Sequence, residues 1–276
     1  MRLGVVALLA SSVSIGLTAV PTAAHAGGPD PARKPAKPEH QGISASDYVD
    51  AVTGLGNCND FAAKAGVLPD ATALLVEAIS DTKGTTKDEF ETTAQFGARQ
   101  TEFWKSRLGD PLHLVIRVPV PAYKVSYDAD RAVALVKYMV DWSVDHHEIE
   151  FYNHDLSNGH YVGTNAYGVQ ADVTSIHAVK GELAFPLGQI IAEGGDVSNV
   201  FVIPMSPDSA RAFKAQPSLL LLASLEPPYL DERSSYSGAT IDEPISLSLT
   251  RKNVHVRLRC GVFMSGRQVV SSNVVR

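Results

Sequence analysis

The sequence is poor in cysteine and in long apolar runs. Only two of the 276 residues are cysteine, Cys58 and Cys260, and they stand too far apart for a C-x-x-C redox centre. Beyond the first 20 residues, no apolar run is longer than the five residues of Leu219–Ala223. Because a membrane-spanning helix needs about 20 apolar residues, we expect no later segment to insert stably into a bilayer and the mature chain to be soluble.

The chain also lacks an excess of positive charge and the common catalytic signatures. Lysine and arginine total 24 against 30 acidic residues, which gives a net charge of −6. A weakly acidic domain has no global field that attracts nucleic acid, so we expect no nucleic-acid partner. The sequence contains no G-x-S-x-G elbow, no phosphate-binding glycine loop and no H-E-x-x-H motif. These absences favour a protein that is not an enzyme, although a dispersed Ser/His/Asp triad stays open.

The first 26 residues have the features of a signal peptide. Arg2 is followed by the mostly apolar stretch Leu3–Val20, and Pro21 precedes Ala24-His25-Ala26, which fits an A-x-A cleavage site. We therefore expect a mature protein that begins at Gly27 and is periplasmic or secreted. A retained membrane anchor is the alternative for the same stretch.

Export favours a disulfide between Cys58 and Cys260, because both cysteines belong to the mature chain. From Asn253 to Cys260, polar and apolar residues alternate, which predicts a half-buried strand with Cys260 on the buried face. Two separate buried thiols are the alternative.

The mature chain divides by composition into three sections. Residues 27–43 are rich in proline and charge and predict a disordered linker. Residues 44–110 carry helical signals, among them a capping box at Thr86-x-x-Glu89. Residues 111–276 change to a period of two and predict strands. We therefore predict an α+β fold: an N-terminal helical section, then a mainly antiparallel β-sheet system with one crossing helix, packed together as one globular unit.

Three further details of the β-rich section are predicted. Turns are expected at Asp128-Ala129-Asp130, Lys180-Gly181, Lys252-Asn253 and Ser265-Gly266. Ser206, followed by Pro207, predicts the start of the crossing helix. Leu219–Leu222 is apolar without alternation, so its strand is expected to be central and covered on both faces.

The densest group of chemically active side chains lies between residues 145 and 155. As a strand, this segment places Ile149 and Phe151 inward and an outward row of His146, Glu148, Glu150, Tyr152 and His154. Imidazole and carboxylate groups on one face suit zinc or a similar divalent ion, so His146, Glu148, Glu150 and His154 are candidate metal ligands. A solvated polar strand face is the alternative.

Two other groups are weaker candidates. Asp128-x-Asp130 resembles a metal-binding acidic pair but also suits a hairpin turn. The basic side chains near the C-terminus would form a patch for an anionic lipid or glycan, or else a mixed-charge sheet face; they are Arg251, Lys252, Arg257, Arg259 and Arg267.

Several short segments carry a resemblance to other proteins. They are Lys87-Asp88-Glu89-Phe90-Glu91-Thr92, Tyr127-Asp128-Ala129-Asp130, Tyr161-Val162-Gly163-x-Asn165-Ala166-Tyr167-Gly168 and the passage from Ser206 to Pro227. In these segments the chain resembles a loose group of uncharacterised exported bacterial proteins. The resemblance implies a bacterial origin and the α+β layout, and it brings no established activity or catalytic residue.

Together these features predict a non-catalytic binding or interaction module of the cell envelope, with an envelope protein or a glycan as its partner and no cofactor. The alternative is a divalent-metal-dependent hydrolase that uses the His/Glu cluster at residues 146–154, with zinc as the expected ion.

Overall fold

The computed structural model of the chain describes residues 44–81, 86–109, 112–138, 141–142, 146–165, 167–190, 199–272 and 274–275. The predicted signal peptide (residues 1–26) and linker (residues 27–43) lie outside these residues. Within them, five α-helices and ten β-strands give an α+β fold, as the sequence predicts. None of the described helices is both long and apolar enough to cross a membrane.

Four helices precede the first strand. They are α1 (Ala45–Thr53), α2 (Cys58–Lys64), α3 (Thr72–Ser80) and α4 (Thr93–Leu108), and α5 (Pro207–Ala215) follows later, capped by Ser206. The strands are β1 (His113–Pro119), β2 (Val125–Asp128), β3 (Val133–Tyr138), β4 (Asp141–Trp142), β5 (His146–Thr164), β6 (Gln170–Pro186), β7 (Asn199–Pro204), β8 (Pro217–Ser237), β9 (Ile245–Ser265) and β10 (Gln268–Ser271). A short 3-10 helix, η2 (Ala122–Lys124), precedes β2.

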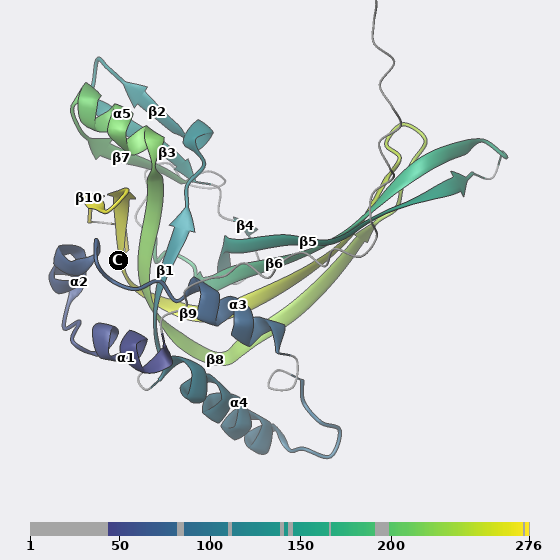
Figure 1. The fold of residues 1–276 in the computed structure, drawn as a ribbon, viewed down its shortest axis with the longest axis horizontal. Helices are drawn as coiled ribbons and strands as arrows, with labels where there is room; N and C mark the ends of the chain where they lie inside the picture. Colours follow the sequence, from purple (N-terminus) through teal and green to yellow (C-terminus); the bar gives the residue numbers. More distant parts are fainter. Residues whose placement is uncertain are drawn as a thin grey trace, which may run out of the picture. The chain divides into compact units, whose positions relative to one another are not determined.

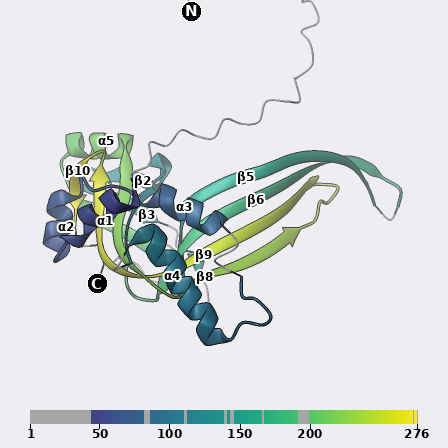
Figure 2. The same ribbon diagram turned by 60° about the horizontal axis from the view of Figure 1, so that its bottom comes forward.

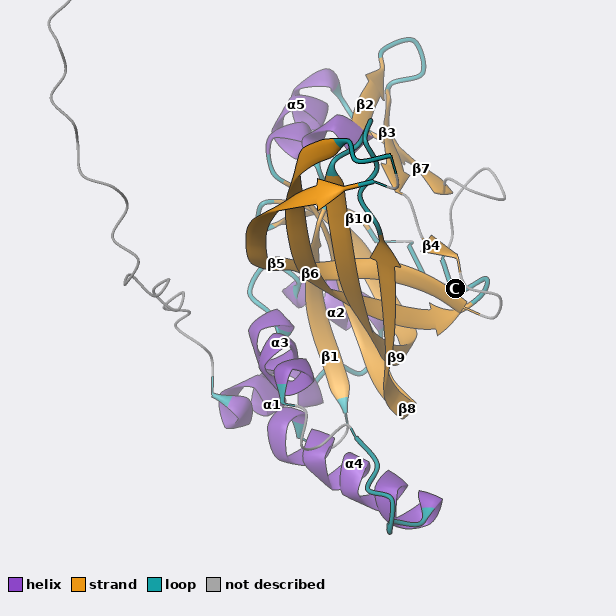
Figure 3. Ribbon diagram, turned by 90° about the vertical axis from the view of Figure 1, so that its right-hand side faces the viewer, coloured by secondary structure: helices purple, strands orange, loops and turns teal. Residues whose placement is uncertain are grey.

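The strands form two sheets (Figure 1). Sheet A has the order β1-β8-β9-β6-β5-β4, with β10 added to β9, and sheet B has the order β2-β3-β7. Strands β6 and β9 run parallel, and the other described pairs are antiparallel. Sheet B and α5 lie toward one end of β1, and helices α1, α3 and α4 lie toward its other end (Figure 3).

The first half of β8 lies between β1 and β9 in the hydrophobic core. The consecutive residues Leu219–Ala223 are each at most 2% exposed, so both faces of the strand are covered. Helices α1 and α3 pack against β1, α4 packs against β8, and α5 packs against β9. The Phe263 ring of β9 meets the rings of Phe201 and Phe213 edge-on, at 4.9 and 6.2 Å between centroids. The prediction that this apolar strand is central is therefore confirmed.

The helical residues also close the outer edge of β1. Tyr48 of α1 accepts a hydrogen bond from Val115 N (2.6 Å) and donates one to His113 O (3.1 Å). Ala71 N, at the start of α3, donates to Val115 O at 2.8 Å. Burial raises the pKa of Tyr48 far above its usual value, which keeps the phenol protonated as a donor. An edge strand with unpaired backbone groups invites pairing with other chains, and these contacts prevent that.

Cys58 and Cys260 form a disulfide that joins the start of α2 to β9. Their Cα atoms lie 5.4 Å apart, and Cys260 is buried, as the alternation predicts. The bond spans a sequence separation of 202, which is worth on the order of 5 kcal/mol in the chain-entropy model. A disulfide is compatible with an exported protein.

Four strands of sheet A are long and run through two of the predicted turns. Strands β5, β6, β8 and β9 have 19, 17, 21 and 21 residues, so the turns predicted at Lys180-Gly181 and Lys252-Asn253 are wrong. A Cβ on Gly181 would lie 2.8 Å from the Phe151 ring, so this glycine serves the close approach of a bulge in β5. Lys252 is paired within the sheet, opposite Gly181 of β6 and Glu232 of β8, and its Nζ donates to Ile79 O at the end of α3 (2.6 Å).

Helix α4 begins later than the predicted capping box. The cap is Thr92, whose Oγ1 accepts from Gln95 N at 3.2 Å, while Gln95 Oε1 accepts from Thr92 N at 2.9 Å. Thr86 and Glu89 lie in the segment before the helix. Both four-residue patterns fit a capping box, so the sequence pattern does not separate them.

Beyond the core, the long strands continue as a sheet that none of the described helices covers (Figure 2). We call this part the distal sheet; it comprises residues 153–164 of β5, 170–180 of β6, 231–237 of β8 and 245–250 of β9. It is a single layer of strands, so the hydrophobic core supports neither of its faces.

Thiol titration of the denatured, unreduced protein is expected to find no free thiol, because both cysteines are in the disulfide. The double variant Cys58→Ser/Cys260→Ser is expected to lose about 2–5 kcal/mol of unfolding free energy, measured by chemical denaturation. The reduced wild-type protein is the control and should show a similar loss. Two titratable thiols before reduction would contradict the pairing.

Candidate functional site

The buried histidine and acidic side chains of the described residues gather in one cluster at the base of the distal sheet. They are His146 and Glu148 of β5, 8% and 5% exposed, and Glu182 of β6, 1% exposed. Asn253 of β9 lies among them and is fully buried. Charged groups are costly to bury unless they are paired, so the partners of these groups define the site.

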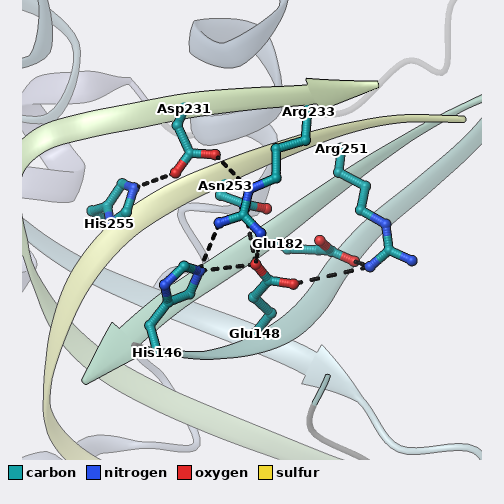
Figure 4. A network of polar contacts seen from close by, with 8 residues as sticks. All are labelled: His146, Glu148, Glu182, Asp231, Arg233, Arg251, Asn253 and His255. Atoms are coloured by element: carbon teal, nitrogen blue, oxygen red, sulfur yellow. Dashed lines mark hydrogen bonds and ion pairs between the residues drawn. The ribbon is translucent and has the colours of Figure 1, made fainter. Parts of the chain in front are cut away.

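Glu148 is at the centre of this cluster, which we call the buried polar cluster (Figure 4). Its Oε1 atom accepts from Asn253 Nδ2 at 3.0 Å and from His146 Nε2 at 2.9 Å, and it lies 3.4 Å from Arg233 Nη1. Because His146 Nε2 donates to Glu148, the 3.2 Å approach of Arg233 Nη2 to the same nitrogen is a contact rather than a second hydrogen bond. One carboxylate oxygen of β5 thus contacts donors from β8 and β9.

Arg251 of β9 extends the cluster to β6. Its Nη1 atom lies 3.3 Å from Glu182 Oε1 and 3.9 Å from Glu148 Oε2. The four central strands of sheet A therefore meet around two carboxylates and two guanidinium groups.

A third acid, Asp231 of β8, adjoins the buried polar cluster. Asp231 Oδ2 accepts from His255 Nε2 at 2.6 Å, and Asp231 Oδ1 lies 3.6 Å from Arg233 Nε. Burial alone would raise the pKa of Asp231, but the hydrogen bond from His255 and the charges of His255, Arg233 and His146 hold the pKa below its usual value. Asp231 is therefore held as a carboxylate.

The guanidinium groups of the cluster lie outside its acids. The side chains of Arg233 and Arg251 are 45% and 32% exposed, whereas the side chain of Glu148 is 4% exposed. Arginine stems cross the apolar surface and carry the charge to water, so they shield the carboxylate below. Two buried acceptors of the cluster, Asn253 Oδ1 and Asp231 Oδ1, have no hydrogen-bond donor among the described residues, although Asp231 Oδ1 lies 3.6 Å from Arg233 Nε. The arrangement is suited to joining strands rather than to attacking a substrate.

Two of the four predicted metal ligands come together. His146 and Glu148 are hydrogen-bonded, whereas Glu150 forms an ion pair with Lys180 and His154 is exposed farther along β5. In the part of the chain that the structure describes, no three His, Cys, Asp or Glu side chains are arranged to hold a metal ion.

The predicted outward position of this strand face is wrong at His146 and Glu148, which are both buried. The prediction fails because β8 and β9 bring two arginines and an asparagine over this face. The inward positions of Ile149 and Phe151 are confirmed, since they are 0% and 6% exposed.

A cleft of about 540 Å³ opens beside Glu148. It is lined by residues 148 and 150–153 of β5 and by residues 119–121, 123 and 124, which include Tyr123 and Lys124. The cleft brings Glu148 and Glu150 near one surface hollow, whose lining is both polar and aromatic.

The basic residues near the C-terminus point in different directions. Arg251 belongs to the buried polar cluster, Lys252 reaches α3, and Arg257 pairs with Glu226 of β8. Neighbouring residues of a strand point to opposite faces, so the basic sequence does not make one patch.

The acidic pair on the β2–β3 connection is a turn. Asp128 Oδ1 accepts from the backbone N–H groups of Asp130 and Arg131, both at 3.1 Å. The Asp128 side chain therefore stabilises the hairpin turn, which is the alternative to a metal-binding acidic pair.

Replacing Glu148 by glutamine is expected to lower the unfolding free energy by about 2–4 kcal/mol, because Arg233 and Arg251 each lose one of their charge partners and the new amide opposes nearby donors. Chemical denaturation measures the loss. The matched control Glu226→Gln breaks the exposed pair with Arg257 and should cost less than about 1 kcal/mol. Equal losses in the two variants would contradict a central role for Glu148.

No protein-family model matches the chain, and comparisons with curated proteins and with solved structures give no match either. The function therefore has to follow from the fold and from the chemistry of the described residues.

Proposed function

We propose that the protein is a non-catalytic binding module of the bacterial cell envelope, periplasmic or secreted, that holds its partner on the distal sheet. The signal-peptide features, the Pro-rich segment and the disulfide support export. The acids of the buried polar cluster support a structural role for the charged residues, because each has a basic or imidazole partner.

Most of the exposed large apolar side chains lie on or near the distal sheet, and this concentration supports the proposal. Among the described residues, eight of the twelve exposed large hydrophobic side chains lie on its strands or their connecting loops: Leu156, Tyr161, Val162, Tyr167, Val169, Tyr236, Ile241 and Ile245. Concentrated exposed apolar surface is typical of interaction sites, and tyrosine suits such surfaces because it has an apolar body and a polar tip.

The register of the distal sheet decides which of its side chains share a face. Ile176 of β6 pairs with Leu247 of β9, and Ala178 pairs with Leu249, so these four side chains share a face. The same face continues toward the buried polar cluster, whereas the opposite face carries serine, threonine and histidine together with Tyr161 and Tyr236. Exposed apolar side chains therefore stand on both faces of this single layer, Val162 and Ile245 on the first face and Tyr161 and Tyr236 on the second, and a partner on either face buries apolar surface.

The partner class follows from this surface. Tyrosine and aliphatic side chains spread over several strands match the composition of protein interfaces, which favours an envelope protein. A cell-envelope glycan, stacked on the tyrosines, is the other class that the sequence leaves open.

The triple variant Tyr161→Ser/Val162→Ser/Tyr236→Ser is expected to lose partner capture and to remain folded. All three side chains are at least 47% exposed, so their loss should change stability by less than about 1 kcal/mol. The measurement is chemical crosslinking of the tagged protein in bacterial envelope extracts, followed by mass spectrometry. The control Phe90→Ser/Leu187→Ser removes exposed apolar side chains elsewhere and should capture the same partner as the wild-type protein.

Equal capture by the two variants, or no specific capture by the wild-type protein, would contradict the proposal. Release of the captured partner by a soluble envelope polysaccharide, with the distal-sheet dependence preserved, would assign the binding to a glycan.

A divalent-metal-dependent hydrolase is the second candidate. The cleft beside Glu148 favours it, because Glu150 lines the same hollow and His146 is hydrogen-bonded to Glu148. The position of Arg233 argues against the hydrolase, because a cation bound to Glu148 would have to displace the Arg233 guanidinium group.

Calorimetric titration with Zn²⁺ separates the two candidates. We expect no saturable heat at micromolar protein, because Glu148 Oε1 already accepts from His146 and Asn253 and Glu148 Oε2 lies 3.9 Å from Arg251 Nη1. A saturable heat that His146→Ala abolishes, and that Glu226→Gln leaves unchanged, would establish a metal site and favour the hydrolase.

A further inference from the structure

A second cleft, at the opposite end of β8 and β9 from the distal sheet, is lined by donors and positive charge. It measures about 630 Å³ and lies between the end of α2, the start of β8 and the β9–β10 turn. Arg117 of β1 and Arg267 of the turn line it, together with the amide of Gln216 and the hydroxyl of Ser218. Among the residues that the structure describes, no aspartate or glutamate lines this cleft.

Arg117 is held in position but is not neutralised. Its Nη1 atom donates to Ser218 Oγ at 3.0 Å and approaches Gly266 O at 3.5 Å. Neither Arg117 nor Arg267 forms an ion pair with an acidic residue of the described chain, whereas six other described arginines do. The one hydrogen bond between Asp70 and Arg117 comes from the Arg117 backbone N–H, not from its guanidinium group, and Asp70 does not line the cleft. The guanidinium group thus keeps donors for a ligand.

The walls of the cleft are fixed by close backbone contacts. A Cβ on Gly66 would lie 2.5 Å from the Arg267 carbonyl oxygen, so the end of α2 touches the β9–β10 turn. Gly266, at φ +58°, donates its N–H to Gln216 O at 3.0 Å. The disulfide anchors α2 to the same strand β9. A preformed site loses less conformational entropy when a ligand binds.

The chemistry of the cleft selects an anion. A protein with a net charge of −6 does not attract anions as a whole, but a cleft lined by two arginines that have no acidic partner is locally positive. A guanidinium group presents parallel N–H donors that match two oxygens of a carboxylate or phosphate. Val67, which is 81% exposed, and Pro217 add apolar surface to the same cleft.

We propose that this cleft binds the carboxylate or phosphate group of a small ligand that also has an apolar body. Arg117 and Arg267 contact the anionic oxygens, Gln216 and Ser218 supply further donors, and the apolar body lies against Val67. The site is separate from the distal sheet, so a test of this cleft does not depend on the proposed partner surface.

NMR titration of the isotope-labelled full chain with sodium phosphate, and separately with sodium acetate, tests this site. Ionic strength is held constant with sodium chloride, so that screening does not change. Saturable shifts are expected for backbone amides around Gly66, Ser218 and Arg267 at millimolar anion or below. The anion that binds more tightly identifies the group as phosphate or carboxylate.

Three variants connect the shifts to the arginines. Arg117→Met is expected to weaken binding by at least about tenfold, and Arg267→Gln by about threefold to tenfold. Arg131→Gln, on the exposed β2–β3 connection, is the matched control and should bind as the wild-type protein does. Arg267 is exposed, so its replacement keeps the test valid even if Arg117→Met fails to fold. Shifts that do not saturate, or an affinity that Arg267→Gln leaves unchanged, would overturn the proposal.

Discussion

The carboxylate of Glu148 is the point on which the four central strands of sheet A depend. It contacts donors from its own strand and from β8 and β9, and through Arg251 it is connected to Glu182 of β6. A buried ion-pair network is a weak source of stability compared with apolar packing, but breaking one partner is costly. A one-residue slip of any of these strands would send its polar side chains to the other face. The cluster therefore specifies the register of strands that are too long to be fixed by the core alone.

This constraint separates the molecule into a covered and an uncovered part. Near β1, helices and apolar side chains bury β8 on both faces, and Tyr48 closes the sheet edge. Past the buried polar cluster, the same strands continue without a helical cover and expose tyrosines and aliphatic side chains (Figure 2). The proposed partner surface thus lies on strands joined by charged side chains, and two of the predicted metal ligands, His146 and Glu148, belong to that joining cluster.

Local patterns in the sequence predict a large part of this fold, and their failures have a common physical cause. The period of two around Cys260, the unbroken apolar run at Leu219–Leu222 and the Asp128 turn each depend on near neighbours, and the structure agrees with them. Alternation tells which side chains share a face but not what covers that face. Glu148 and Asn253 are far apart in sequence, so their hydrogen bond leaves no local signal.

The same cause explains the turns and the sites that the sequence does not give. Gly181 suits a turn by composition, but the bulge of β5 opposite it is what requires a glycine. Likewise, Arg117 and Arg267 join one cleft only because β1 and the β9–β10 turn meet in space. The sequence does not predict that the distal sheet is uncovered, because apolar and polar residues alternate in the same way on a covered strand and on an uncovered one.

On this account, the buried polar cluster holds the long strands in register at the base of the distal sheet. Amide hydrogen exchange in the Glu148→Gln variant tests it most directly, because exchange reports opening strand by strand. We predict a selective loss of protection at residues 146–150, 180–184 and 251–255 and in the distal sheet, while Leu219–Leu222 keeps its protection. Protection that is unchanged everywhere, or that falls equally in the distal sheet and in the core, would contradict the claim.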